Sequence, residues 1–179
     1  MVGNVNRLVV QSLSRRALER RRRSAAKVVN VSEKYLEDFA VGQTYGSGRV
    51  TVDKDRVKTF AAEFDPQPFH MDDEAARGSI FGRLAASGWH TAALTMRLLV
   101  DGELKPAGGI VGVGFDELRW PLPVHPGDEL HVESEVLEVR PSKTRPNQGL
   151  IKVKTTTRNQ DGEAVQVTVV NLIVPRRRQ

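Results

Sequence analysis

The chain has 179 residues, 39% of them hydrophobic and 27% charged, which is typical of one soluble globular domain, and no apolar run is long enough to span a membrane. It has no cysteine, which excludes disulfides, thiolate nucleophiles and cysteine-based metal sites. The net charge of +5 comes from the two ends, because residues 35–175 hold 15 basic and 20 acidic residues. The acidic balance of this central part excludes the basic face that a nucleic-acid-binding domain needs.

The first segment, residues 1–34, carries nine Lys or Arg against two Glu. Three interpretations remain open for it: a poorly ordered or weakly helical extension, a mitochondrial transit peptide, or a short basic interaction arm. We expect a cytoplasmic protein, or one of the mitochondrial matrix if the segment is a transit peptide. The folded domain is expected over residues 35–175, followed by a basic C-terminal tail at 176–179.

The domain is predicted to begin with a β-like run over residues 43–52. Asp53 then stands where an N-cap is expected, ahead of a helix over residues 54–63. Two prolines in the segment 65–70 exclude a helix there and predict a rigid loop. A short helical turn is expected over residues 72–77.

A longer helix is predicted over residues 87–99, because its apolar residues recur at helical spacing and form one stripe: Trp89, Ala92, Ala93, Met96, Leu99 and Val100. After Gly108 the pattern changes to alternation of apolar and polar residues, in runs at 111–115, 130–132, 136–139, 151–153 and 165–169. Turns are expected at 126–128, 147–149 and 159–162. One early strand, one long helix and consecutive antiparallel strands predict an α+β fold, with a sheet folded about a central helix.

The segment 64–70 carries the chemistry of greatest interest, because its rigid loop holds a carboxylate, Asp65, and an imidazole, His70. Adding water to a conjugated double bond needs one group to activate the water and one to deliver a proton, and an acid–histidine pair supplies both. The alternative is that Asp65 only caps the following turn and His70 fills a polar pocket.

Ser87 and Gly88 begin the long helix, and free N–H groups at a helix N-terminus stabilise developing negative charge. Ser87 is expected to cap this helix and not to act as a nucleophile, because no G-x-S-x-G elbow surrounds it. The four histidines have no paired spacing, so we expect no metal. Arg83, Arg97 and Arg119 are candidate cations for an anionic substrate.

Three motifs occur in a definite order: Asp-x-x-Pro-x-His from Asp65 to His70, then Ser87-Gly88 before the long helix, then Phe115 followed by Pro123-Val-x-Pro-Gly-Asp. Together they make the chain similar to the MaoC-like (R)-specific enoyl-CoA hydratase family, over roughly residues 35–175. The resemblance implies a hot-dog fold, a homodimer or a dimer of dimers, and acyl-CoA substrates bound at the subunit interface. We expect no cofactor, and the charge distribution and the apolar runs of the sequence predict no nucleic-acid partner and no membrane partner.

The resemblance also implies roles for particular residues. The family's catalytic pair falls on Asp65 and His70, and its oxyanion-binding backbone amide on Gly88. From their places in the motifs we also expect Gln67, Ser87, Trp89 and His90 to contact the substrate, with packing beside the site as the alternative for His90. Gln67 stands where the family usually has asparagine, and Ser87 where well-known members have histidine, which puts the acyl specificity in question. The predicted activity interconverts a trans-2-enoyl-CoA and a 3-hydroxyacyl-CoA. The alternatives are an acyl-CoA thioesterase and a non-catalytic acyl-CoA-binding subunit.

Overall fold

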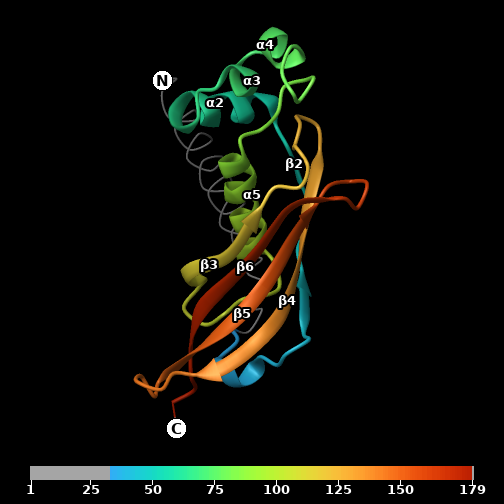
Figure 1. Cartoon of the computed structure of the whole chain (residues 1–179). Helices are drawn as coiled ribbons and strands as arrows, with labels where there is room; N and C mark the ends of the chain where they lie inside the picture. Colours follow the sequence, from blue (N-terminus) through green and yellow to red (C-terminus); the bar gives the residue numbers. More distant parts are fainter. Residues whose placement is uncertain (1–32, 179) are drawn as a thin grey trace, which may run out of the picture. The chain divides into compact units, whose positions relative to one another are not determined.

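The computed structural model describes residues 33–178 (Figure 1). The first 32 residues, on which the predicted N-terminal extension falls, lie outside the described part. In chain order the elements are η1 (Leu36–Asp38), β1 (Thr44–Gly46), β2 (Val50–Thr51), α2 (Lys54–Phe64), α3 (Pro68–Met71), α4 (Asp73–Arg77), α5 (Gly88–Asp101), β3 (Val111–Arg119), β4 (Glu129–Pro141), β5 (Gln148–Arg158) and β6 (Ala164–Pro175). None of the helices within residues 33–178 is long and apolar enough to cross a membrane.

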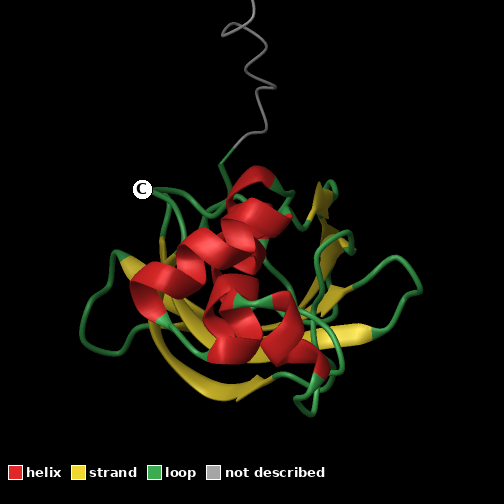
Figure 2. Cartoon of the chain, turned by 90° about the horizontal axis from the view of Figure 1, so that it is seen from above, coloured by secondary structure: helices red, strands yellow, loops and turns green. Residues whose placement is uncertain are grey.

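The strands form one antiparallel sheet in the order β1-β4-β5-β6-β3, and the short strand β2 also pairs with β4. Helix α5 lies against one face of this sheet, and the sheet curves around it, as the view from above shows (Figure 2). Helices α2, α3 and α4 gather at the N-terminal end of α5 (Figure 1). This is a hot-dog arrangement, so the predicted fold class is confirmed.

The core consists of two clusters of buried side chains. One cluster joins α2, α5 and β4 and includes Val57, Leu98 and Leu130. The other lies between η1 and the central strands and includes Leu36 and Ile151. Leu130 and Ile151 are fully buried, and truncating such a side chain to alanine typically costs about 2–5 kcal/mol. These clusters therefore fix α5 and the segment before it relative to the sheet.

The predicted N-cap at Asp53 is confirmed, because its side chain accepts a hydrogen bond from the N–H of Arg56 at 2.9 Å. The exclusion of a helix from the segment 65–70 is wrong, because α3 begins at Pro68 and contains His70. Proline is tolerated at the first position of a helix, where its missing N–H would have had no intrahelical acceptor. Only the residues before Pro68 form the loop.

The apolar stripe predicted on the long helix is only partly buried. The buried residues of α5 are His90, Thr91, Thr95, Leu98 and Leu99, and of these only Leu99 belongs to the stripe. Trp89 and Met96 from the predicted stripe are 59% and 44% exposed, and both line a cavity between α5 and the sheet. The helix therefore presents Trp89 and Met96 to open space, while it buries two threonines together with Leu98 and Leu99.

The strand predictions differ from the structure mainly in length. The alternating runs at 130–132 and 136–139 belong to one strand, β4, which has an irregular register between Val136 and Glu138. The turn expected at 147–149 lies slightly earlier, because β5 already begins at Gln148. At the C-terminal end, Arg176 and Arg177 form ion pairs with Glu37 and Asp38, so the start of the basic tail is bound to η1.

Candidate active site

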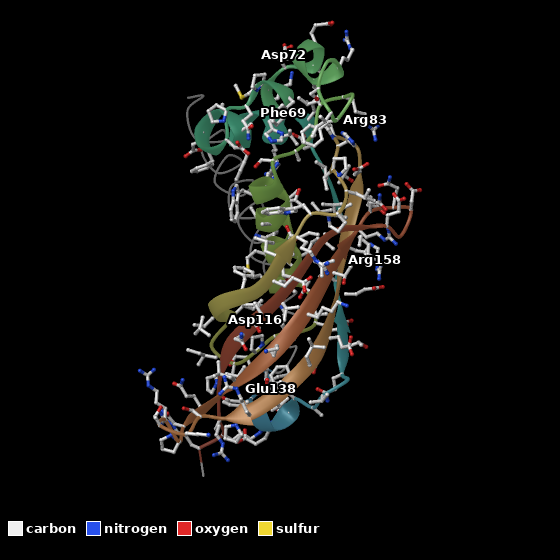
Figure 3. The ribbon with its side chains drawn as sticks, in the orientation of Figure 1. Phe69, Asp72, Arg83, Asp116, Glu138 and Arg158 are labelled. Atoms are coloured by element: carbon white, nitrogen blue, oxygen red, sulfur yellow. The ribbon has the colours of Figure 1, made fainter. Side chains whose placement is uncertain are left out.

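A cavity of about 500 Å³ lies where the α2–α3 segment, the start of α5 and the segment before β4 meet. Its polar wall contains Asp65, Gln67 and His70, and its apolar wall contains Phe69, Trp89 and Trp120. Phe69 lies at the helical end of the molecule, whereas Asp116 and Glu138 lie farther along the sheet (Figure 3). The cavity brings together residues of all three sequence motifs, because Pro123 and Val124 of the third motif also line it.

Asp65 follows the last residue of α2 and acts as its C-cap. One carboxylate oxygen, Oδ2, accepts a hydrogen bond from Ser87 Oγ at 2.6 Å, and the other, Oδ1, accepts one from Gln67 Nε2 at 2.7 Å. The bond from Ser87, with smaller contributions from Gln67 and His70, holds the pKa of the Asp65 carboxyl below its ordinary value, although burial opposes this. Asp65 is therefore ionised at neutral pH.

His70 is 5% exposed and projects from α3 toward Asp65. Its Nδ1 lies 2.8 Å from the carbonyl oxygen of Ala85. Since a carbonyl only accepts, Nδ1 carries the proton, and the lone pair of the neutral ring is on Nε2. Nε2 lies 3.5 Å from Oδ2 of Asp65. The two side chains therefore converge on one point of the cavity without a short bond between them, and one water molecule can contact both.

Ser87 is fully buried and makes two contacts through its hydroxyl. Besides donating to Asp65, Ser87 Oγ accepts a hydrogen bond from the N–H of Trp89 at 3.2 Å. The prediction of a helix cap is confirmed, but the bond to Asp65 was not foreseen. It ties the first turn of α5 to the carboxylate, across 22 residues of sequence.

Gly88, the first residue of α5, lines the cavity. The N–H of a first helical residue has no intrahelical acceptor, so it is available to an anion or a carbonyl oxygen. A Cβ atom at this position would lie 2.9 Å from Cε2 of Trp120. Glycine is therefore required here because the indole of Trp120 packs directly on the backbone.

The expected substrate contacts occupy different places. Gln67 and Trp89 line the cavity. Ser87 lies behind its wall, in contact with Asp65. His90 does not line the cavity: its ring stacks on Phe60 of α2 at 4.9 Å, it is 7% exposed, and burial lowers its pKa.

Sequence reasoning did not single out Trp120, which follows the last residue of β3. The indole lies edge-to-face with Trp89, with ring centroids 5.4 Å apart, and its Nε1 donates to Gln166 Oε1 at 2.8 Å. The sequence signal that could have identified it is the segment Trp-Pro-Leu-Pro. Two nearby prolines end a strand, so they place the aromatic residue at the end of β3.

The three candidate arginines also differ in their surroundings. Arg97 pairs with Asp101 at 2.6 Å, and Arg119 pairs with Glu117 at 2.5 Å. Arg83 forms no ion pair with any residue between 33 and 178, and it lies at the same end of the molecule as Phe69 (Figure 3). In the same part of the chain, no group of three His, Asp or Glu side chains is placed to hold a metal ion.

The sequence matches the MaoC-like domain family over residues 38–159. The 3-hydroxyacyl-thioester dehydratase Z of Mycobacterium tuberculosis is 30% identical over 140 residues, covering 75% of this chain and 89% of that protein. The crystal structure of a MaoC-like dehydratase from Rhodospirillum rubrum is similar with a TM-score of 0.79 and 55% identity, covering 82% of this chain and 99% of that one. An R-hydratase from Pseudomonas aeruginosa is similar with a TM-score of 0.63 and 27% identity, covering 80% and 86% of the two chains.

Proposed function

Because this chain belongs to the MaoC-like dehydratase domain family, we propose that it interconverts a trans-2-enoyl-CoA and a 3-hydroxyacyl-CoA with Asp65 and His70 as its acid–base pair. The observation that carries the proposal is the 3.5 Å approach of His70 Nε2 to the Asp65 carboxylate, in a cavity that also contains Gly88. The 3-hydroxyacyl-thioester dehydratase and the R-hydratase among the similar proteins support the same reaction class.

In the hydration direction, a water molecule bound between Asp65 and His70 attacks the β-carbon of the enoyl group. Its proton passes to His70 Nε2, the atom with a free lone pair, and is then delivered to the α-carbon. Asp65 is the weaker base, since its two oxygens already accept hydrogen bonds from Ser87 and Gln67. Its negative charge stabilises the imidazolium that forms beside it. Dehydration reverses these steps.

Negative charge develops on the thioester oxygen as the β-carbon is attacked. We assign the backbone N–H of Gly88 to this oxygen, because Gly88 is the first residue of α5 and lines the cavity. A donor aimed at developing charge typically lowers the barrier by roughly 3–4 kcal/mol. We also assign Arg83 to the CoA phosphates, since it has no acidic partner within the described residues. Arg83→Gln should raise KM for an enoyl-CoA and leave kcat nearly unchanged.

The deciding assay follows enoyl absorbance and free thiol together, across a panel of enoyl-CoA thioesters. Hydration predicts that the absorbance decays while no thiol appears. Stoichiometric release of thiol would contradict the proposal and favour the thioesterase. If neither signal changes but acyl-CoA binds, the chain is a non-catalytic binding subunit.

We further propose that the chain forms a homodimer through β3. This strand is at the edge of the sheet, so one side of its backbone is unpaired within the described residues. Its apolar side chains Val111, Val113 and Phe115 are 49%, 56% and 60% exposed. An edge strand that is both unpaired and apolar favours pairing with a second copy. Val113→Lys should therefore give a monomer in sedimentation equilibrium, and an unchanged mass would place the contact elsewhere.

A further inference from the structure

A second cavity, of about 250 Å³, lies between α5 and the sheet. Its wall is largely apolar and includes Leu99, Leu118, Val153 and Val170. We call this space the inner cavity, and the cavity that contains Asp65 and His70 the catalytic cavity. Trp89 lines both of them. The two spaces are therefore neighbours, and the side chains between them decide whether one ligand can occupy both.

Trp120 lies at this boundary. It lines the catalytic cavity, while its hydrogen-bond acceptor, Gln166 on β6, lines the inner cavity. The indole is held on three sides: by the backbone of Gly88, by the edge-to-face contact with Trp89, and by the bond to Gln166. An unrestrained indole can adopt several rotamers, but these contacts select one of them for Trp120.

Gln166 is 2% exposed, although the inner cavity around it is mostly apolar. A buried amide is costly unless it is hydrogen-bonded, and the part-buried indole N–H of Trp120, a residue that is 38% exposed, likewise needs an acceptor. The bond between Gln166 Oε1 and Trp120 Nε1, at 2.8 Å, meets both requirements. Moving the indole would leave Gln166 without this partner, so Gln166 opposes opening of the boundary.

We propose that Trp120, held in place by Gln166, ends the acyl-binding site and restricts this chain to short acyl groups. The inference rests on the function proposed above. With the thioester oxygen at the Gly88 N–H, an acyl chain that extends toward α5 and the sheet meets the indole, which packs on that same glycine. A longer chain needs the inner cavity, and it reaches that cavity only if the indole moves.

The test compares crotonyl-, hexenoyl-, octenoyl- and dodecenoyl-CoA on the wild type, Trp120→Leu and Gln166→Leu. The first variant removes the indole, and the second removes the acceptor that holds it at similar side-chain volume. We expect the wild type to prefer crotonyl- or hexenoyl-CoA. In both variants the ratio of kcat/KM for octenoyl-CoA to that for crotonyl-CoA should rise by about 10-fold or more, since each methylene accommodated in an apolar pocket typically changes kcat/KM by at least that factor.

The matched control is Phe64→Leu, an aromatic-to-leucine change at a residue that is 64% exposed and lines neither cavity. It should leave the preference for acyl length unchanged. The effects of Trp120→Leu and Gln166→Leu should not add in the double variant, because both act by freeing the same boundary. If Trp120→Leu fails to fold by circular dichroism, Gln166→Leu decides the question.

Titrations with butyryl- and octanoyl-CoA separate this inference from the proposed reaction. If the variants bind octanoyl-CoA more tightly relative to butyryl-CoA than the wild type does, the result supports Trp120 as the end of the acyl-binding site. This holds even if neither the wild type nor the variants hydrate any substrate, and in that case only the proposed reaction is contradicted. Active variants whose preferences for length match the wild type, in turnover and in binding, would overturn the inference and leave the hydratase proposal intact. A wild type that already prefers octenoyl- to crotonyl-CoA would overturn it as well.

Discussion

Ser87→Ala is the most informative single change at the candidate site. It removes one hydroxyl that is fully buried and that serves two partners, the carboxylate of Asp65 at 2.6 Å and the N–H of Trp89 at 3.2 Å. Alanine fits the same space, so the perturbation is confined to these two hydrogen bonds. Each of them has a different consequence, one for the stability of α5 and one for the pKa of Asp65.

The loss of the cap at the start of α5 should lower the free energy of unfolding by about 1 kcal/mol. The bond to an ionised carboxylate is worth roughly 1.5–3 kcal/mol when fully buried. The Asp65 side chain is 20% exposed, so water replaces part of that contribution, and we expect a total loss of about 2 kcal/mol at neutral pH.

The pH dependence distinguishes the two contributions. The folded pKa of Asp65 lies below 3.8, the ordinary value for aspartate, chiefly because Ser87 donates to the carboxylate. The stability that this bond contributes is therefore fully present above the unfolded pKa and is lost as pH falls through the folded pKa. The difference between wild type and Ser87→Ala should be largest near neutral pH and should narrow toward acid, leaving the contribution of the cap.

Two measurements check this reasoning: chemical denaturation at several pH values, and the pKa of Asp65 followed by NMR through the chemical shift of its carboxyl carbon. In Ser87→Ala the pKa of Asp65 should rise, because the hydrogen bond from Ser87 is the main cause of its low value. Ser87→Gly is the control, since glycine at an N-cap costs only a few tenths of a kcal/mol, yet it removes the same bond to Asp65. It should reproduce the rise in the pKa of Asp65 with a smaller loss of stability. A pKa of Asp65 that stays unchanged in both variants would refute the role of Ser87 in holding the carboxylate.

Asp65→Asn and His70→Gln should each lower kcat by about 100-fold or more while the circular dichroism spectrum stays close to wild type; near-normal turnover in either variant would remove that residue from the mechanism. Gln67→Ala should lower kcat/KM less than Ser87→Ala does, because Gln67 is exposed and water can replace its 2.7 Å bond to Asp65; a larger effect than that of Ser87→Ala would mean that Gln67 contacts the substrate. Deletion of residues 1–30 should leave activity and melting temperature nearly unchanged, because the family match begins at residue 38; a large loss of either, measured on the purified truncated chain, would assign the basic segment to the fold or to the dimer.

Much of the fold could be predicted because local signals and tertiary packing agree. The Asp53 cap, the alternating strands and the turn at residues 159–162 are each specified within a few residues of sequence. The apolar stripe on α5 could be predicted, but its burial could not, because spacing identifies one face of a helix and does not say whether that face is packed or lines a cavity. Trp89 and Met96 are at helical spacing, and the open space beside them depends on strands far away in sequence.

The candidate site could be predicted only where its residues are close in sequence. The segment from Asp65 to His70 was identified from the residue types that acid–base chemistry needs. The bond from Ser87 to Asp65 and the packing of Trp120 on Gly88 could not be foreseen, because they join segments that meet only in the folded chain. A serine before a glycine at the start of a helix predicts a helix cap in any protein. Nothing near Ser87 in the sequence indicates that its hydroxyl also binds the Asp65 carboxylate.

The order of the strands in the sheet has a consequence for how the chain folds. β4, β5 and β6 are consecutive in sequence and pair with their immediate neighbours, so the loops that must close between them are short. In contrast, β1 pairs with β4 across about 90 residues, as in the partners Thr44 and Glu135. Because closing a long loop costs more entropy than closing a short one, we expect the β4–β6 hairpins to form early and α2–α4 to dock late. The proposed catalytic groups would then meet at the last step of folding, and the amide protons of α2–α4 should exchange with solvent well before those of β5.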